Sequence, residues 1–273
     1  MLDGLVPGDQ LPTEQSLART VGVSRANIRE ALKLLENEGV VKAVQGKGRF
    51  LSAVGGLRVE RHIDGLLEHM ADAEGSKPKL CHRLDRDTSG LLVLARSREM
   101  AAKMGKAFEN KNIRKYYWAL VAPAPEENEG SIVAPLAKGE DSFKDMMVVD
   151  EENGKFARTE FKVIERAAKK AAFLALWPRT GRTHQLRVHC QVAGFPIIGD
   201  EKYGNDDAAA DMVQALGLAP RLHLHAARLI LPHPGGKGIL DLRAPLPPEL
   251  RKSWGDFGFD YDFSDDPFAD IRL

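Results

Sequence analysis

The sequence predicts an α+β protein built from two parts of unequal size. In residues 1–53, apolar residues recur at helical spacing and a short glycine-rich stretch follows. Residues 54–273 contain runs of strand composition, of which Leu91–Ala95 and Lys115–Leu120 are the clearest. A chain of 273 residues is long enough for a small domain joined to a medium one. We therefore expect two domains with a boundary near Val54.

Composition predicts a globular protein of the cytoplasm. Hydrophobic residues make up 43% of the chain and charged residues 29%, as in ordinary globular domains. No apolar run reaches the roughly 20 residues of a membrane-spanning helix, and the N-terminus lacks the pattern of a signal peptide. Lys and Arg number 39, as do Asp and Glu, so a nucleic-acid surface must come from local clusters rather than net charge.

Two cysteines, Cys81 and Cys190, each adjoin a histidine, which raises a metal site as an alternative. The paired-ligand spacing of zinc motifs is absent, and neighbouring side chains on a strand point to opposite faces. Two cysteines are also too few for a disulfide framework. We expect no metal.

Residues 1–53 predict two helices and a hairpin. Pro12–Glu14 supplies an N-cap and an acidic first turn for a helix that ends at Gly22. Ser24 caps a second helix that extends to about Glu38, with one apolar face made by Ile28, Ala31, Leu32 and Leu35. Residues 40–51 then predict two strands around Gln45–Gly48. Two helices, a tight turn and a hairpin make a winged helix-turn-helix.

Three stretches of residues 1–53 resemble the DNA-binding domain of GntR-type transcription regulators: LPTEQSLA, VSRANIREALKLLENEGVV and VQGKGRFLS. The resemblance implies DNA as a partner, with Gly46 in the wing near the minor groove. It implies that the start of the recognition helix faces the major groove, through Ser24, Arg25, Ala26, Asn27 and Arg29. The alternative is a small helical domain with exposed basic residues.

Three words in residues 54–273 carry candidate chemistry. The word CHRLDRDTSG, residues 81–90, is a polar loop in which Asp85 lies among arginines that would keep it ionised. The alternative is that its charged residues only form a cluster of ion pairs on the surface. The word RTGRTHQLRVH, residues 179–189, has the cationic density that suits phosphate or a carboxylate partner. KYYWAL, residues 115–120, offers aromatic rings for stacking on a base or for ordinary core packing.

Four stretches of the sequence resemble the Rlu class of pseudouridine synthases, of the RluA/RluC type. In chain order they are HRLDRDTSG, KYYWA, GRTHQLRVH with FPIIGD, and LHLHAARLILPHP. The resemblance implies a mixed, largely antiparallel sheet with a central cleft. It implies that Asp85 is the catalytic aspartate, that Tyr117 lies beside the target base, and that Arg187 is the partner of Asp85. Arg83 matches an arginine that displaces the target nucleotide. The expected RNA-binding residues are Arg83, Arg86, Arg182 and His184.

The activity implied is isomerisation of uridine to pseudouridine in RNA, with no redox change and no cofactor. The stretches RHIDGLLEHM and SWGDFGFDYDFSDDPF are similar to the branch that acts on large-subunit ribosomal RNA. The strands that usually begin this catalytic domain have no counterpart here. Two alternatives follow: a DNA-binding regulator with an inactive synthase-like domain, or a non-functional fusion. Structural roles are expected for the histidines of these words, His82, His184, His189, His223 and His225.

Overall fold

The computed structural model divides the chain into two compact units, Met1–Ala71 and Asp72–Leu273, and each is described by itself. The predicted boundary near Val54 lies outside the described residues. The structure describes residues 10–21, 24–26, 28–29, 32–33, 41–44, 48–51, 67, 70–72, 75–109, 113–140, 146–204, 213–262 and 265–271.

Among the described residues of the first unit, helical and strand segments follow one another in the predicted order. Helix α1 spans Glu14–Val21, and the Thr13 hydroxyl caps it by accepting the N–H of Ser16 at 3.2 Å. Residues 25–26, 28–29 and 32–33 are helical. Strands β1 (Val41–Val44) and β2 (Gly48–Leu51) form an antiparallel hairpin. The predicted turn at Gly46 and the residue Asn27 lie outside the description.

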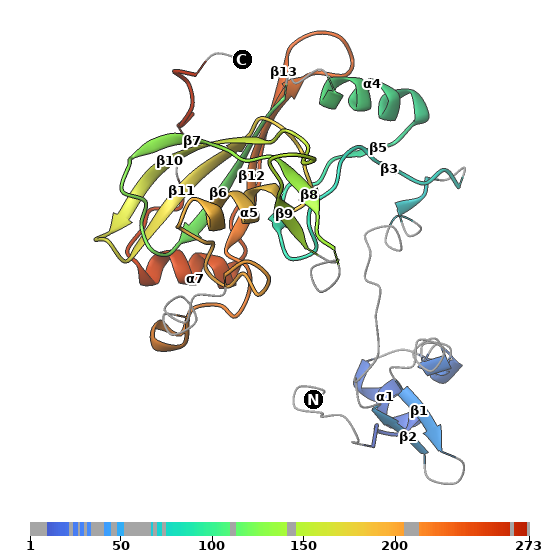
Figure 1. Cartoon of the computed structure of the whole chain (residues 1–273). Coiled ribbons are helices and arrows are strands. Elements are labelled where there is room, and N and C mark those ends of the chain that lie inside the picture. Colours follow the sequence, from blue (N-terminus) through green and yellow to red (C-terminus); the bar gives the residue numbers. More distant parts are fainter. Residues whose placement is uncertain are drawn as a thin grey trace. The chain divides into compact units, whose positions relative to one another are not determined.

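The second unit is built on a seven-stranded sheet, shown in Figure 1. Its strands run in the order β13-β12-β6-β11-β10-β7, every neighbouring pair on this path is antiparallel, and the short β4 pairs in parallel with β12. The sheet is therefore mixed and largely antiparallel, as expected. Its strands are β4 (Ser89–Gly90), β6 (Arg114–Val121), β7 (Glu129–Val133), β10 (Arg158–Ala167), β11 (Ala171–Pro178), β12 (Leu224–Pro232) and β13 (Ile239–Arg243).

Strand β6 separates two hydrophobic cores because its side chains alternate between the faces of the sheet. On one face Tyr116 and Trp118 pack in a core that includes Trp254 of helix α7 (Pro248–Asp256). On the other face Tyr117 packs at the edge of a core that includes Leu186 of helix α5 (Gln185–Val192). The two helices thus cover opposite faces of the sheet.

Two small sheets and a helix complete the described second unit. Helix α4 spans Arg98–Glu109, and none of the helices in the described ranges is long and apolar enough to cross a membrane. Strands β3 (Lys79–Leu80) and β5 (Leu94–Ala95) form one antiparallel pair. Strands β8 (Leu136–Lys138) and β9 (Met147–Val149) form another.

The predicted strand Leu91–Ala95 is wrong as a continuous element. The chain first pairs with β12, where the N–H of Leu91 donates to the carbonyl of Ala226 at 2.9 Å. It then changes partner, and only Leu94–Ala95 forms a strand, β5. At the crossing point Gly90 has φ +112°, and a Cβ atom there would lie 2.2 Å from the carbonyl oxygen of Ala226. Only glycine fits this approach.

Candidate active site

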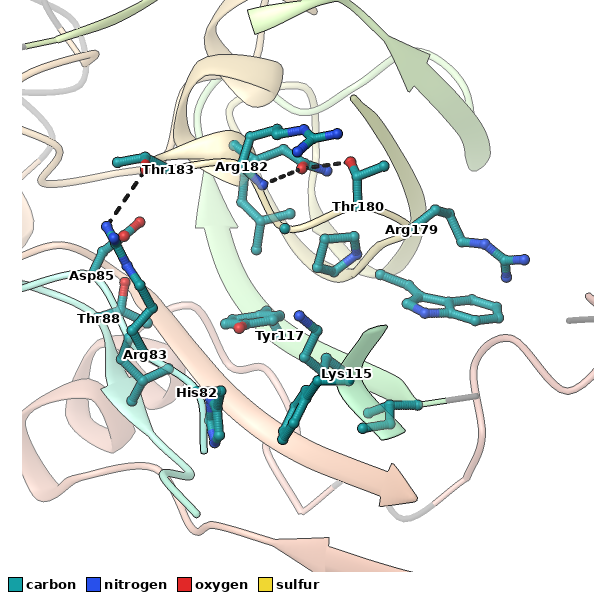
Figure 2. Close-up of a pocket in the computed structure, with 18 of the residues that line it drawn as sticks. His82, Arg83, Asp85, Thr88, Lys115, Tyr117, Arg179, Thr180, Arg182 and Thr183 are labelled. Carbon is teal, nitrogen blue, oxygen red and sulfur yellow. Dashed lines mark hydrogen bonds between the residues drawn. The ribbon is translucent and has the colours of Figure 1, made fainter. Parts of the chain in front are cut away.

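A cavity of about 450 Å³ opens on the face of the sheet where Tyr117 lies. Three segments line it: the loop 81–88, hereafter the Asp85 loop; strand β6; and the turn Arg179–Thr183, hereafter the arginine turn. Figure 2 shows side chains from all three directed into the same space. The three words that the sequence singled out therefore meet at one site.

The Asp85 loop is fixed at several points. The ring of His82 accepts the N–H of Val93 at 2.9 Å, which joins the two sides of the loop. Within the loop, the N–H of Thr88 donates to the carbonyl of Asp85 at 3.0 Å. At its end, the Ser89 hydroxyl lies 2.8 Å from Nδ1 of His225 on β12. These contacts hold the half-buried Asp85 side chain at the edge of the cavity.

Tyr117 lies close enough to Asp85 for the charge of the carboxylate to affect the ionisation of the phenol. Burial raises the pKa of the Tyr117 phenol, and the negative charge of Asp85 raises it further. The phenol is therefore neutral over the physiological pH range and keeps a hydrogen that it can donate. Its ring lines the cavity.

Arg187 has a different partner from the one expected. Its Nε lies 2.7 Å from Oδ2 of Asp200, and one terminal nitrogen lies 2.6 Å from Oδ1 of the same carboxylate. A second carboxylate, Asp87, lies 3.9 Å from its other terminal nitrogen. Among the ion pairs of the described residues there is none between Arg187 and Asp85.

Burial explains this pairing. The Arg187 side chain is 3% exposed and that of Asp200 1%, and a buried cation needs a buried, hydrogen-bonded counterion. Burial opposes the charge of Arg187, but the hydrogen-bonded Asp200, followed by the charges of Asp85 and Asp87, raises its pKa. Arg187 therefore anchors helix α5 to Asp200, and the charge of Asp85 helps to keep its guanidinium ionised.

The four residues expected to bind RNA fall into two groups. Arg83 and Arg182 are exposed and line the cavity from opposite sides, and the Arg83 guanidinium lies 3.5 Å from the Thr183 hydroxyl. Arg86 is exposed but is not among the lining residues. His184 is also outside the lining, and its Nδ1 lies 2.8 Å from the hydroxyl of Tyr203.

Three further cavity residues were not predicted from the sequence. Gln185 is buried, and its amide accepts the N–H of Arg182 at 3.0 Å and contacts the Thr180 hydroxyl at 2.7 Å, so it shapes the arginine turn. The Arg179 guanidinium lies 4.0 Å from the centre of the Trp177 ring. Lys115 lies two residues before Tyr117 on β6, and strand alternation was the signal for it.

The motif histidines make structural contacts. Burial lowers the pKa of His82 and of His223 to about 4. Three of the histidine rings contact backbone carbonyl oxygens at 3.1 Å: His189 contacts Ala134, His223 contacts Ile198 and His225 contacts Ala244. Within the described ranges, no three His, Cys, Asp or Glu side chains gather as metal ligands.

In the first unit, the predicted DNA-binding residues differ in their contacts. Ser24 and Arg25 are exposed. Arg29 forms an ion pair with Glu14 of α1, with nitrogen and oxygen 3.1 Å apart, although its side chain remains 53% exposed. Asn27 and Gly46 are not among the described residues.

The fold and the cavity define an enzyme-like domain in which one carboxylate lies among cations, and comparison with known proteins identifies its family. The family model for RNA pseudouridylate synthases matches residues 50–192. The chain belongs to this family. A second model, that of bacterial regulatory proteins of the gntR family, matches residues 3–51.

Individual relatives agree with the family match. The ribosomal large subunit pseudouridine synthase C of Pasteurella multocida is 37% identical over 226 residues, which cover 83% of this chain and 65% of that protein. The protein of the same name from Escherichia coli is 36% identical and covers 76% and 61% of the two chains. The chain therefore spans less than two thirds of the length of these relatives. The solved structure of human RNA pseudouridylate synthase domain containing 4 has 30% identity and a TM-score of 0.60, over 71% of this chain and 83% of that one.

Proposed function

We propose that this protein isomerises uridine to pseudouridine within RNA, and that Asp85 is its catalytic residue. The observation that carries the proposal is the place of Asp85: its carboxylate lies at the edge of the cavity near the Tyr117 hydroxyl. Among the described residues that line the cavity, it is the one acidic side chain. Membership of the RNA pseudouridylate synthase family supports the same reaction.

The reaction breaks the bond between N1 of uracil and C1′ of ribose and forms a bond between C5 and C1′. The C5 proton is lost and N1 gains one, so no oxidant or reductant takes part. A carboxylate suffices as the covalent participant, by adding to the base or by attacking the sugar. We assign this role to Asp85, and the stacking of the displaced base to Tyr117.

The base must first leave its stack, which costs a few kcal/mol in a paired segment and less in a loop. The cations that line the cavity supply compensating contacts to phosphate: Arg83 from the Asp85 loop, and Arg179 and Arg182 from the arginine turn. Since the relatives carry the name of ribosomal large subunit pseudouridine synthase C, we propose large-subunit ribosomal RNA as the substrate.

The test is pseudouridine formation on unmodified large-subunit ribosomal RNA by the intact protein and by Asp85→Asn. We expect the intact protein to form pseudouridine and Asp85→Asn to be slower by at least about 10³-fold. The matched control is Asp87→Asn, in the same loop but 52% exposed. An exposed ion pair contributes at most about 1 kcal/mol, so this variant should lose less than about fivefold. A well-folded wild-type protein that modifies no RNA would contradict the proposal.

We propose as a second function that residues 1–53 form a separate domain that binds DNA. The match of residues 3–51 to the gntR family model supports this, as does the exposure of Arg25 at the start of the second helical segment. After selection of a preferred duplex from a random pool, Arg25→Ala should weaken its binding about tenfold, the usual effect of losing one base contact. Arg19→Ala, an exposed arginine on α1, is the control. Equal effects of the two variants would contradict base-specific contact by Arg25.

A further inference from the structure

Lys115 occupies a position in the cavity that the proposed chemistry does not yet use. It lies on β6 two residues from Tyr117, so both side chains project from the same face of the strand. Figure 2 shows Lys115 beside Tyr117 and directed into the cavity. A Cβ atom added to Gly181 would lie 3.8 Å from Nζ of Lys115, so the ammonium reaches across to the arginine turn.

The ammonium of Lys115 has an unusual environment for a lysine. Its side chain is half-buried, and no other side chain or backbone group in the described part of the chain forms a hydrogen bond or an ion pair with it. Burial lowers its pKa. Lys162 shows the ordinary alternative, since its ammonium lies 2.9 Å from each of two carboxylates, Glu129 and Asp270.

An ammonium that is partly withdrawn from water without a partner costs stability. Such a group is expected where a ligand supplies the missing acceptor. A displaced nucleotide offers two kinds of acceptor, phosphate oxygens and the carbonyl oxygens of the base. The exposed Arg83 and Arg182 stand at the mouth of the cavity, where phosphates pass. Lys115 stands on the floor beside the ring against which the base would stack.

The chemistry of the ammonium makes it selective among bases. An ammonium has three donors and no acceptor. Uracil presents a carbonyl oxygen at its 4-position, whereas cytosine presents an amino group there, which is itself a donor. A donor that faces position 4 therefore favours uracil and disfavours cytosine.

We propose that Lys115 donates a hydrogen bond to O4 of the displaced uracil and thereby makes the cavity select uridine over cytidine. This inference rests on the proposed function, because it places a uracil against Tyr117. Lys115 is then a specificity-determining residue that contacts the substrate, and the arginines at the mouth contribute affinity for any RNA.

The experiment uses the full-length protein and an RNA fragment that contains the uridine modified by the wild type. Binding is measured in the Asp85→Asn background, so that no turnover occurs, to three versions of the fragment: with uridine, with cytidine and with an abasic residue at the target position. We expect uridine to bind about tenfold more tightly than cytidine. Adding Lys115→Met should reduce uridine binding to the level of cytidine, and Lys115→Arg should restore part of the preference.

The control variant is Arg182→Met, which should weaken all three RNAs alike. If Lys115→Met also weakens all three alike, its partner is phosphate, and if it changes none, it has no partner in the RNA. Either result overturns the inference. A loss of affinity for the uridine and cytidine RNAs together, with the abasic RNA unchanged, points to O2, which both bases share, and overturns the assignment to O4. Absence of pseudouridine with the wild type overturns the proposed function, and this inference with it, before any binding is compared.

Discussion

Lys115 and His223 each carry a polar group whose burial has a measurable cost. Lys115 is half-buried without a partner in the described chain, and His223 is fully buried with Nε2 unbonded there. Natural sequences usually break such local rules where a function or a packing requirement compensates. The two residues differ in this respect, because Lys115 lines the cavity and His223 stacks on Trp254 in the core.

We expect Lys115→Met to stabilise the free protein by about 1 kcal/mol, because it replaces an unpaired, partly desolvated charge with an apolar side chain of similar length. Urea unfolding of the two proteins measures the difference. Lys162→Met is the control and should not stabilise, since it removes two ion pairs. Destabilisation by Lys115→Met would mean that the ammonium has a partner in the free protein.

His223 should make stability fall in acid. Burial lowers its pKa to about 4, whereas in the unfolded chain it titrates near 6.5. Between these values the unfolded chain binds a proton that the folded protein excludes, so its contribution is complete above pH 6.5 and declines towards pH 4. The loss is at most about 3 kcal/mol. His223→Gln should therefore have a flatter dependence of unfolding free energy on pH than the wild type; parallel curves would contradict this.

At the scale of the element, the Asp85 loop is held by the strands beside it. Gly90 permits β4 to approach β12 because any Cβ atom would meet the carbonyl of Ala226. We expect Gly90→Ala to destabilise the protein by about 2 kcal/mol or more and to lower kcat, since Asp85 would shift with the loop.

The matched control is Gly105→Ala in helix α4, where an added Cβ meets nothing within 4 Å. That change should stabilise by up to about 1 kcal/mol, because alanine favours a helix. Thermal unfolding and single-turnover rates of both variants separate the two effects. Similar behaviour of the two glycine variants would refute the special role of Gly90.

The sequence allowed good prediction of elements whose signal is local. Strand β6 follows from its composition, and the helix α1 from its cap at Thr13. Partners distant in the chain were harder to predict. Arg187 forms hydrogen bonds with Asp200 and not with Asp85, because a buried arginine pairs with the carboxylate that is buried beside it. Which carboxylate is buried depends on the fold and cannot be read from the local sequence. Leu91 was assigned to a continuous strand because apolar composition does not reveal a change of pairing partner.

At the scale of the molecule, charge is distributed unevenly although its sum is zero. Arg83, Arg179 and Arg182 line one cavity with a single acidic residue among the described lining. RNA binding should therefore weaken as the salt concentration rises. In a plot of log binding constant against log salt concentration, each phosphate contacted in a single strand should contribute about 0.7 to the slope.

Arg83→Gln and Arg182→Gln should each reduce that slope by about 0.7, measured by binding of single-stranded RNA at several salt concentrations. Lys252→Gln serves as the control, because Lys252 lies on α7, which packs on the sheet face opposite to Tyr117. If all three variants have the same slope as the wild type, the cavity cations do not contact phosphate.

The Asp85 loop is held by hydrogen bonds of the segments that flank it. Strands β3 and β5 pair at its base, His82 bonds to the N–H of Val93 across it, and the N–H of Leu91 bonds to β12. The amide hydrogens of Leu91 and Val93 should therefore exchange with solvent as slowly as those of the sheet, although this segment joins short elements. Because the loop is rigid, the carboxylate of Asp85 already has its final orientation before a nucleotide binds. The free energy of RNA binding is then available to distort the substrate.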